Sequence, residues 1–145
     1  MANAARTDPH PAFNFLVEID GIAVAGFAEC SGLGSETDVI EYREGGDRTR
    51  SARKIPGLTR WTAIVLRRGI TTGRELWNWR RAIVNGQLDR RAGAIVLLGH
   101  DGTPVARWTF QAGWPAKWVG PELRARASDV AIETLEIVHE GLELE

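Results

Sequence analysis

The sequence is poor in the residues that build disulfides and metal sites. It contains one cysteine, Cys30, so an internal disulfide and a cysteine metal cluster are both impossible. Its three histidines, His10, His100 and His139, have no second histidine or cysteine at the spacing of a metal site. We therefore expect no cofactor and no metal. A chain of 145 residues can instead fold on its own hydrophobic core.

Long apolar runs are also missing. No stretch approaches the roughly 20 apolar residues that a membrane-spanning helix needs, so we expect no direct membrane anchoring. The N-terminal residues lack the apolar centre of a signal peptide, which predicts synthesis in the cytoplasm without export by that route. Outside the cell, the protein would therefore act within a larger released particle. The net charge of −1 does not favour a general binder of nucleic acid or membrane surfaces.

Catalytic motifs are absent as well. Cys30 begins a C-S-G sequence, but the G-x-S-x-G elbow of a nucleophilic hydrolase is missing, so we interpret Cys30 as a small packed residue. The carboxylate pairs Glu41 with Glu44 and Glu133 with Glu136 have the spacing of solvated strand faces. The glycine-rich stretches lack the strand–loop–helix context of a phosphate site. The sequence predicts a protein that is not an enzyme.

What the sequence does have is a series of strand patterns. Phenylalanine, valine and isoleucine alternate with other residues over 13–19, and Asp20 followed by Gly21 predicts a two-residue type I′ hairpin turn. Proline interrupts an aromatic segment over 114–121. The last pattern favours a strand, although its apolar spacing would also suit a helix. Strands are predicted over residues 13–19, 22–29, 37–44, 61–68, 94–98, 104–110 and 130–139.

One helix is predicted between residues 72 and 85. Thr72 and Glu75 have the spacing of a capping box, and Asn85 followed by Gly86 predicts the C-terminal end. Arg80 lies in the middle of the apolar face, where its stem packs and its head reaches water, or where it meets an acid of a neighbouring subunit. The residues expected to pack, or to form an interface, include Arg80 and the apolar side chains Leu76, Trp77, Trp79, Ile83 and Val84.

Together these elements predict a mainly β protein of the α+β kind. The expected architecture is an antiparallel β-sandwich or small barrel with one packed α-helix. Residues 1–11 contain Pro9 and Pro11 and are expected to form a flexible N-terminal arm, while residues 12–145 form a single domain.

A long polar loop, predicted from Gly45 to Pro56, concentrates the positive charge of the chain. Three interpretations are open: a solvated loop, phosphate contacts to nucleic acid, or docking onto acidic residues of an adjacent subunit. The slightly acidic chain and the lack of interleaved aromatics weigh against nucleic acid, so docking is favoured. The residues expected to make the contact are Gly45, Gly46, Asp47, Arg48, Arg50, Arg53, Lys54 and Pro56.

Segments along nearly the whole chain, from Pro9 to Leu142, resemble one known family. They include FNFLVEIDG at 13–21, FAECSGL at 27–33, IEYREGG at 40–46, KIPGLT at 54–59 and LRRGIT at 66–71. The series continues with LWNWR at 76–80, ARWTF at 106–110, WPAKW at 114–118, IETLE at 132–136 and HEGL at 139–142. In this order they resemble the inner tube proteins of contractile tails, which occur in phages and in extracellular contractile injection systems.

The resemblance implies a fold of the tail-tube type and a structural function. Members of the family form hexameric rings that stack into a hollow tube, and a contractile sheath drives the tube through a target envelope. The implied partners are other copies of the chain, the sheath protein, baseplate or tube-initiator proteins, terminator proteins, and cargo protein or DNA in the lumen. The loop from Gly45 to Pro56 would contact the neighbouring ring.

Several assignments within this family are compatible with the sequence. An injection particle is favoured over two alternatives, the tail tube of a phage virion and a tube-initiator subunit at the baseplate. A nucleic-acid-binding module that uses the loop from Arg48 to Lys54 is a more distant alternative.

Overall fold

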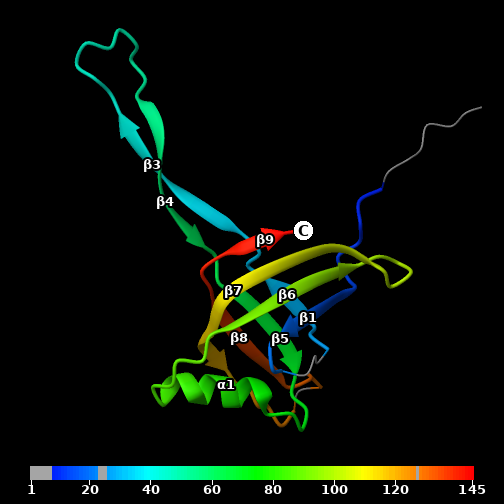
Figure 1. The fold of residues 1–145 in the computed structure, drawn as a ribbon. Coiled ribbons are helices and arrows are strands. Elements are labelled where there is room, and N and C mark those ends of the chain that lie inside the picture. The colour runs from blue at the N-terminus through cyan, green and yellow to red at the C-terminus, as the bar shows by residue number, and fades with distance from the viewer. Residues whose placement is uncertain (1–7, 23–25, 127) are drawn as a thin grey trace, which may run out of the picture.

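The computed structural model describes residues 8–22, 26–126 and 128–145. This part of the chain contains nine β-strands and one α-helix (Figure 1). The elements are β1 (Phe15–Ile19), β2 (Glu29–Ser31), β3 (Ser35–Tyr42), β4 (Arg53–Trp61), β5 (Ile64–Gly69), α1 (Glu75–Val84), β6 (Arg91–Leu98), β7 (Pro104–Val119), β8 (Ile132–Val138) and β9 (Leu142–Leu144). The mainly β architecture with one helix confirms the predicted fold class.

Seven strands form one antiparallel sheet in the order β1-β6-β7-β8-β5-β2, with β9 added to β7. Strand β7 is 16 residues long and belongs to both halves of this sheet. Its first part pairs with β6 and β9, and its second part pairs with β8. The sheet therefore folds across β7, and α1 packs below it (Figure 1). The core between these layers consists of Val17, Ile19, Ile64, Leu66, Leu76, Trp79, Ile95, Phe110, Leu135 and Ile137.

The bend in β7 explains why the predicted break at residues 114–121 is wrong. Ala112 has a φ of 52°, a left-handed conformation that redirects the strand between its two halves. Pro115 continues the strand opposite Ile137, and the register shifts between Pro115 and Lys117. A proline is tolerated next to such an irregularity because the missing N–H leaves no gap in a regular ladder. The aromatic segment is thus a strand that faces α1.

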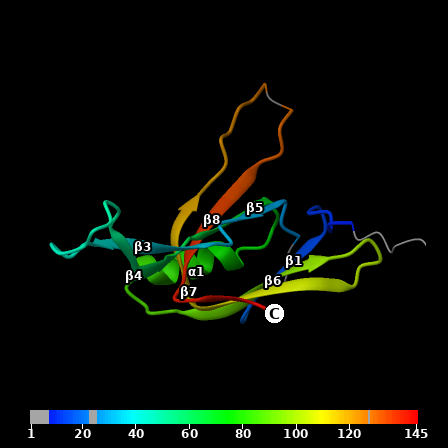
Figure 2. The ribbon, with the colours of Figure 1, turned by 90° about the horizontal axis from the view of Figure 1, so that it is seen from above.

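The hairpin formed by β3 and β4 is a separate sheet of two strands that projects from the body (Figures 1 and 2). The predicted loop from Gly45 to Pro56 is therefore too long, because Arg53 already begins β4. The predicted strand over 61–68 is present as β5, but its predicted start is too early, since β4 ends at Trp61 and β5 begins at Ile64. The alternation of apolar and polar residues alone could not show where β4 ends and β5 begins, because the two strands follow each other so closely.

The turn at Asp20 and Gly21 forms, but with different geometry from the prediction. The Ile22 N–H donates to the Ile19 carbonyl oxygen at 3.0 Å. Only Gly21 has a positive φ, 73°, whereas a type I′ turn needs positive φ at both central residues. The predicted returning strand over 22–29 is wrong at both ends, because Ile22 makes an isolated bridge and β2 begins at Glu29. Its middle, residues 23–25, lies outside the described residues.

The structure confirms the predicted C-terminal end of the helix, but the predicted capping box at its N-terminus does not form. Gly86 has a φ of 83°, and its N–H donates to the Ile83 carbonyl oxygen at 3.0 Å. The N-cap is Arg74, with no capping hydrogen bond from a side chain, so the capping box of Thr72 is wrong. The carboxylate of Glu75 binds a different group, described below.

The C-terminal residues settle an alternative that the sequence left open. Residues 132–138 form strand β8, whose side chains Leu135 and Ile137 are fully buried. The helical alternative is therefore wrong. Strand β9, which follows and pairs with β7, has no counterpart in the prediction.

Candidate assembly surface

The β3–β4 hairpin carries apolar side chains on a ribbon that has water on both faces. Ile40 lies directly opposite Ile55, and Tyr42 lies opposite Arg53. Side chains two positions apart in a strand share a face, so Ile40, Tyr42 and Ile55 lie together. We call these three residues the apolar hairpin face. Their exposed fractions are 51%, 46% and 42%, which is high for large side chains grouped on one surface.

The hairpin is held in shape by polar contacts along its length. The Arg60 guanidinium donates to Asp38 Oδ2 at 2.7 Å, and the hydroxyls of Thr37 and Thr59 are 2.9 Å apart. The chain is shifted in register between Thr37 and Val39, which marks a bulge. These contacts are exposed, so each contributes little free energy, but together they fix the direction of the ribbon.

The tip of the hairpin is also ordered by local bonds. Arg43 donates to the carbonyl oxygens of Thr49 and Asp47 at 3.2 and 3.1 Å. The Asp47 carboxylate accepts from the Glu44 N–H at 3.0 Å and lies 3.6 Å from Arg53. Local hydrogen bonds therefore order the turn at the tip, and they occupy the side chains of Arg43 and Asp47.

The predicted contact residues fall into two groups. Gly45, Gly46, Asp47, Arg48 and Arg50 lie in the tip, whereas Arg53, Lys54 and Pro56 lie in strand β4. Within the described residues, the side chains of Arg48, Arg50 and Lys54 are exposed and make no hydrogen bond or ion pair. Two positive charges at the tip, and a third near the start of β4, thus have no ion-pair partner among the described residues.

The three residues predicted on the helix have three different environments. Trp79 is buried, its Nε1 donates to the Asp89 carbonyl oxygen at 2.9 Å, and Arg91 stacks over its ring. Trp77 is 40% exposed. Arg80 donates to the Pro115 carbonyl oxygen at 3.0 Å, so its head is bound within this chain. Trp79 is a core residue, and Trp77 is available at the surface.

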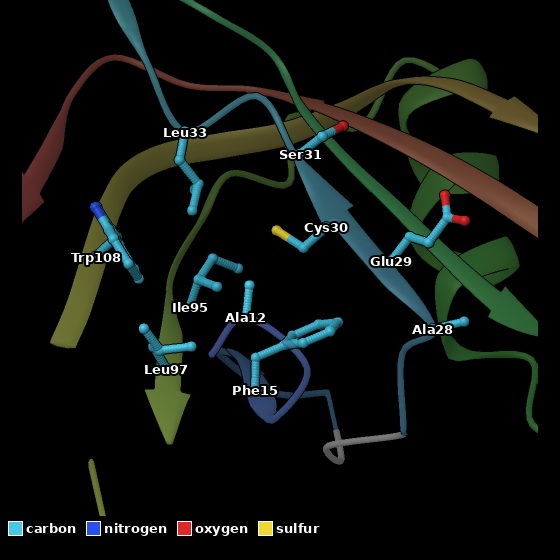
Figure 3. A pocket seen from close by; sticks show the side chains of 10 residues that line it. All are labelled: Ala12, Phe15, Ala28, Glu29, Cys30, Ser31, Leu33, Ile95, Leu97 and Trp108. Carbon is cyan, nitrogen blue, oxygen red and sulfur yellow. The ribbon is translucent and has the colours of Figure 1, made fainter. Parts of the chain in front are cut away.

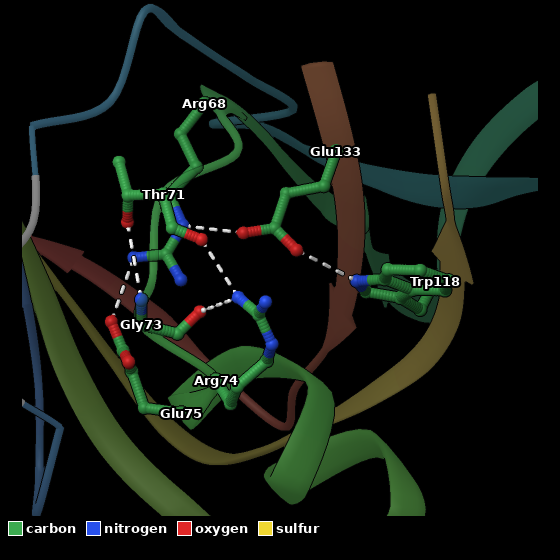
Figure 4. Close-up of polar contacts among 7 residues, drawn as sticks. All are labelled: Arg68, Thr71, Gly73, Arg74, Glu75, Trp118 and Glu133. Atoms are coloured by element: carbon green, nitrogen blue, oxygen red, sulfur yellow. Dashed lines mark hydrogen bonds and ion pairs between the residues drawn. The ribbon is translucent and has the colours of Figure 1, made fainter. Parts of the chain in front are cut away.

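A buried ionic cluster joins α1 to the sheet, and the sequence reasoning missed it. Arg68 is 2% exposed and donates from Nε to Glu133 Oε1 at 2.6 Å and from Nη1 to Glu75 Oε1 at 2.8 Å (Figure 4). Trp118 Nε1 donates to the second oxygen of Glu133 at 3.1 Å. The cluster therefore connects β5, β7, β8 and the first turn of the helix.

The charges of this cluster stabilise one another. Burial alone would lower the pKa of Arg68, but the hydrogen bonds to Glu133 and Glu75 outweigh it, so the pKa is raised. The hydrogen bond from Arg68 lowers the pKa of Glu75. Strand alternation could have revealed the cluster, because Arg68 continues the inward series of Ile64 and Leu66.

An apolar cavity of about 460 Å³ lies where the two ends of the sheet face each other (Figure 3). Phe15 comes from β1 and Cys30 from β2, which are the first and last strands in the sheet order. Burial raises the pKa of the Cys30 thiol to about 11, so it stays neutral at pH 7 and is no nucleophile. Each of these edge strands has a side without a ladder partner among the described residues, and such edges favour pairing with another chain.

No set of three or more His, Cys, Asp or Glu side chains in the described part of the chain is arranged to hold a metal ion.

Helix α1, the one helix among the described residues, lacks the length and apolarity needed to cross a bilayer.

The chain thus has a projecting hairpin and a sheet whose edge strands lack a ladder partner on one side among the described residues, and comparison with known proteins identifies its family. Residues 11–143 match the family model of T4-like virus tail tube protein gp19. This chain belongs to that tail tube family. No curated protein sequence is similar enough to count as a match.

Solved structures of tail tube proteins have the same fold. The chain is 25% identical to a protein in the tube-terminating cap of the anti-feeding prophage, with a TM-score of 0.88 over 99% of this chain and 95% of that one. It is 28% identical to a protein in the PVC sheath–tube complex, an extracellular contractile injection system in its extended state. That TM-score is 0.84, over 94% of this chain and 91% of that one.

A more distant likeness shows the fold alone. Hcp1 from Flavobacterium johnsoniae is 15% identical, with a TM-score of 0.58 over 90% of this chain and 93% of that one. The family match and the likeness to the protein of the PVC sheath–tube complex identify this protein as a structural subunit of a tail tube of the contractile type.

Proposed function

We propose that copies of this chain assemble into hexameric rings, and that the rings stack into the inner tube of a contractile injection particle. The family match supports a structural rather than a catalytic role. The similar proteins at 25–28% identity were solved in a sheath–tube complex and a tube cap of such particles, which favours an injection particle over a phage virion. By the same likeness, we expect a sheath and a terminating cap as partners of the assembled tube. The likeness to a protein solved in the baseplate of the anti-feeding prophage, at 25% identity, adds a baseplate.

The observation that carries this proposal is the β3–β4 hairpin. Its apolar face is too exposed to be explained by the stability of one chain, because covering each of these side chains would gain on the order of 1 kcal/mol. The hairpin is ordered by its own bonds before any partner arrives, so little conformational entropy is lost on docking. The β3–β4 hairpin is therefore the surface on which we expect a second copy to bind.

The geometry of such a contact favours a tube. A projecting element of one subunit that docks on a different surface of the next makes a heterologous contact, which propagates along an axis when it does not close. Within a ring, pairing at the edges of β1 and β2 would remove exposed strand edges. Two kinds of contact, one within rings and one between them, are what a stacked tube requires.

The proposal is tested by negative-stain electron microscopy and light scattering of the purified protein over a range of concentrations. We expect rings or short tubes of the wild-type chain. The variant Arg48→Glu/Arg50→Glu should keep the fold but stack less, because two unpartnered charges at the tip are reversed. Arg90→Glu/Arg126→Glu changes the net charge equally at two other exposed arginines and should stack normally.

Two results would contradict the proposal. One is a wild-type chain that stays monomeric even when it is produced with the sheath and baseplate proteins of its particle. The other is equal stacking of the two double variants, which would remove the hairpin tip from the contact between rings. Salt-sensitive binding of DNA or RNA by the monomer would then favour a nucleic-acid-binding module.

A further inference from the structure

Helix α1 carries an aromatic cleft that the contacts within this chain leave open. A cavity of about 300 Å³ lies beside its first turns and is lined by Ile70, Gly73, Arg74, Trp77, Trp118 and Glu133. The rings of Trp77 and Trp118 meet edge to face, with their centroids 4.9 Å apart. A volume at the lower limit of small-ligand sites has room for one large side chain of a partner.

The polar groups around this cleft already have partners. Trp118 Nε1 donates to one oxygen of Glu133, and Arg68 binds the other oxygen. In the described part of the chain, no buried polar side-chain atom lacks a hydrogen bond. The surface left for a partner is therefore that of the two tryptophan rings. A polar group placed there would lose its hydrogen bonds to water and gain none in return. An apolar anchor fits the cleft best.

Two arginines lie near this anchor site: Arg74, the N-cap residue of α1, lines the cleft, and Arg81 lies four residues after Trp77 in the helix. Arg74, Trp77 and Arg81 are spaced three and four residues apart, which places them along one side of a helix. Arg74 donates to the carbonyl oxygens of Thr71 and Gly73 at 2.7 and 3.0 Å (Figure 4).

Neither of these two arginines is held in an ion pair within the described chain, although the charge of Arg74 contributes to lowering the pKa of Glu75. Arg81 donates to Asn78 Oδ1 at 3.3 Å, and neither Arg74 nor Arg81 forms an ion pair with a described carboxylate. Glu75, the acid in the first turn of the helix, is already bound by Arg68. Carboxylates of a partner would be complementary to both guanidinium groups.

The position of this surface separates it from the hairpin. Helix α1 lies at the end of the molecule opposite the hairpin tip (Figure 1). A partner on α1 can therefore bind while the hairpin contacts another copy. One similar protein was solved within a sheath–tube complex, so an enclosing protein is a partner that such a subunit meets.

We propose that the α1 surface formed by Arg74, Trp77, Arg81 and Trp118 binds an acidic segment of a protein that encloses the tube. The segment places one large apolar side chain in the cleft and carboxylates beside the two arginines. This inference rests on the proposed function, because the partner is a different subunit of the assembled particle. A central aromatic pocket with charged residues at its rim is the usual form of a binding hot spot.

Photo-crosslinking within assembled particles tests this proposal. A photo-reactive residue replaces Asn78, which is exposed on the same side of the helix, and a control places it at Leu88, which is exposed beyond the end of the helix. Particles are produced from all their structural proteins, irradiated, and analysed by mass spectrometry. We expect an adduct from position 78 alone, to a peptide of another subunit in which carboxylates surround a large apolar residue.

Substitutions then connect the adduct to the proposed contacts. Arg74→Glu/Arg81→Glu should lower its yield by about tenfold or more, because two attractive contacts become repulsive. The neutral variant Arg74→Gln/Arg81→Gln should give an intermediate yield, and Trp77→Ala should also lower it. Arg90→Glu is the matched control and should leave the yield unchanged, since Arg90 is exposed but lies beyond the end of the helix.

Each contrary outcome overturns a defined part of the argument. The α1 proposal fails if position 78 crosslinks to another copy of this chain, to a segment without carboxylates, or to nothing in complete particles. It also fails if charge reversal leaves the yield unchanged. Particles that lack a tube of this chain would instead contradict the proposed function, and the α1 proposal with it.

Discussion

The body of the molecule and its projecting hairpin use similar residues in opposite ways. In the body, Arg68 is buried and both of its partners are carboxylates of the same chain. At the hairpin tip, Arg48 and Arg50 are exposed, and neither has a partner among the described residues. The apolar side chains differ in the same way, because Leu66 is 1% exposed and Ile40 is 51% exposed. The charges and apolar side chains of the body's core are satisfied within one chain, whereas those of the hairpin are left for the second copy that we propose as its partner.

The largest effect expected on stability comes from the tryptophan inside the body. Trp79→Ala should lower the free energy of unfolding by about 3–5 kcal/mol, because a fully buried indole is replaced by a cavity. It also removes a hydrogen bond to the Asp89 carbonyl oxygen. Urea denaturation followed by circular dichroism measures the change.

Trp77 is the matched control on the same helix. Because it is 40% exposed and contacts mainly Trp118, Trp77→Ala should cost about 0.5–1.5 kcal/mol. Equal losses for the two variants would show that the helix does not bury the face that Trp79 occupies.

A smaller loss is expected when the buried ionic cluster is broken. Arg68→Met keeps much of the side-chain length but leaves Glu133, which is 6% exposed, without its positive partner. Removing one member of a buried ion pair usually lowers the free energy of unfolding by about 3–5 kcal/mol. We expect about 3 kcal/mol here, because Glu75 is partly exposed. The unfolding free energy in urea is again the measurement.

The neighbouring arginine provides the control for this substitution. Arg67 points to the other face of β5 and lies 3.6 Å from Glu29, with both side chains more than half exposed. Arg67→Met should therefore change stability by less than about 1 kcal/mol. If Arg67→Met costs as much as Arg68→Met, the cluster does not hold the helix to the sheet.

The parts of the fold that the sequence predicted well are those with local signals. The apolar run at 94–98 forms the C-terminal part of β6, whose residues 94–96 are buried, and Asn85 followed by Gly86 ends the helix. The ordered segments along the chain indicated the family, which the comparisons confirmed. These signals depend on residues close in sequence, where periodicity and turn chemistry decide the structure.

The parts that could not be predicted depend on contacts between distant residues. Strand β7 continues through Pro115 because β8 and β9 pair with its two halves, which no local pattern shows. Thr72 fits a capping box by spacing, but Glu75 binds Arg68 instead. The sequence indicates the basic loop as a candidate contact but not the apolar hairpin face, because the predicted loop includes Ile55, which lies in strand β4.

The hairpin should show a different response, with little change in stability and a large change in assembly. Ile40→Ser/Ile55→Ser removes a directly opposite pair from the apolar hairpin face. Since both side chains are exposed, the unfolding free energy of the monomer should change by less than about 1 kcal/mol. Sedimentation of tubes should fall sharply, because the surface covered by the second copy is lost.

Exposed aliphatic residues of the body provide the comparison for this variant. Val84→Ser/Leu88→Ser alters two side chains that are 65% and 75% exposed, and should affect neither stability nor sedimentation of tubes. A hairpin variant that sediments like wild type would show that this face has no role in assembly. A hairpin variant that unfolds much more easily would show that the hairpin is part of the core, and the distinction between the two regions would fail.

The smallest expected effect is on the pH dependence of the unfolding free energy, and it arises from the body of the molecule alone. The hydrogen bond from Arg68 lowers the pKa of Glu75 below its ordinary value of 4.5. The unfolded chain therefore binds this proton first as the pH falls, so the contribution of Glu75 to stability is present above pH 4.5 and is lost as the pH falls through the folded pKa. Between about pH 6 and pH 3, the wild type should lose more unfolding free energy than Glu75→Gln, by less than about 1 kcal/mol because the carboxylate is partly exposed. Equal losses would mean that the charge of Glu75 does not contribute to docking the helix, and that only packing against Leu76 and Trp79 secures it to the sheet.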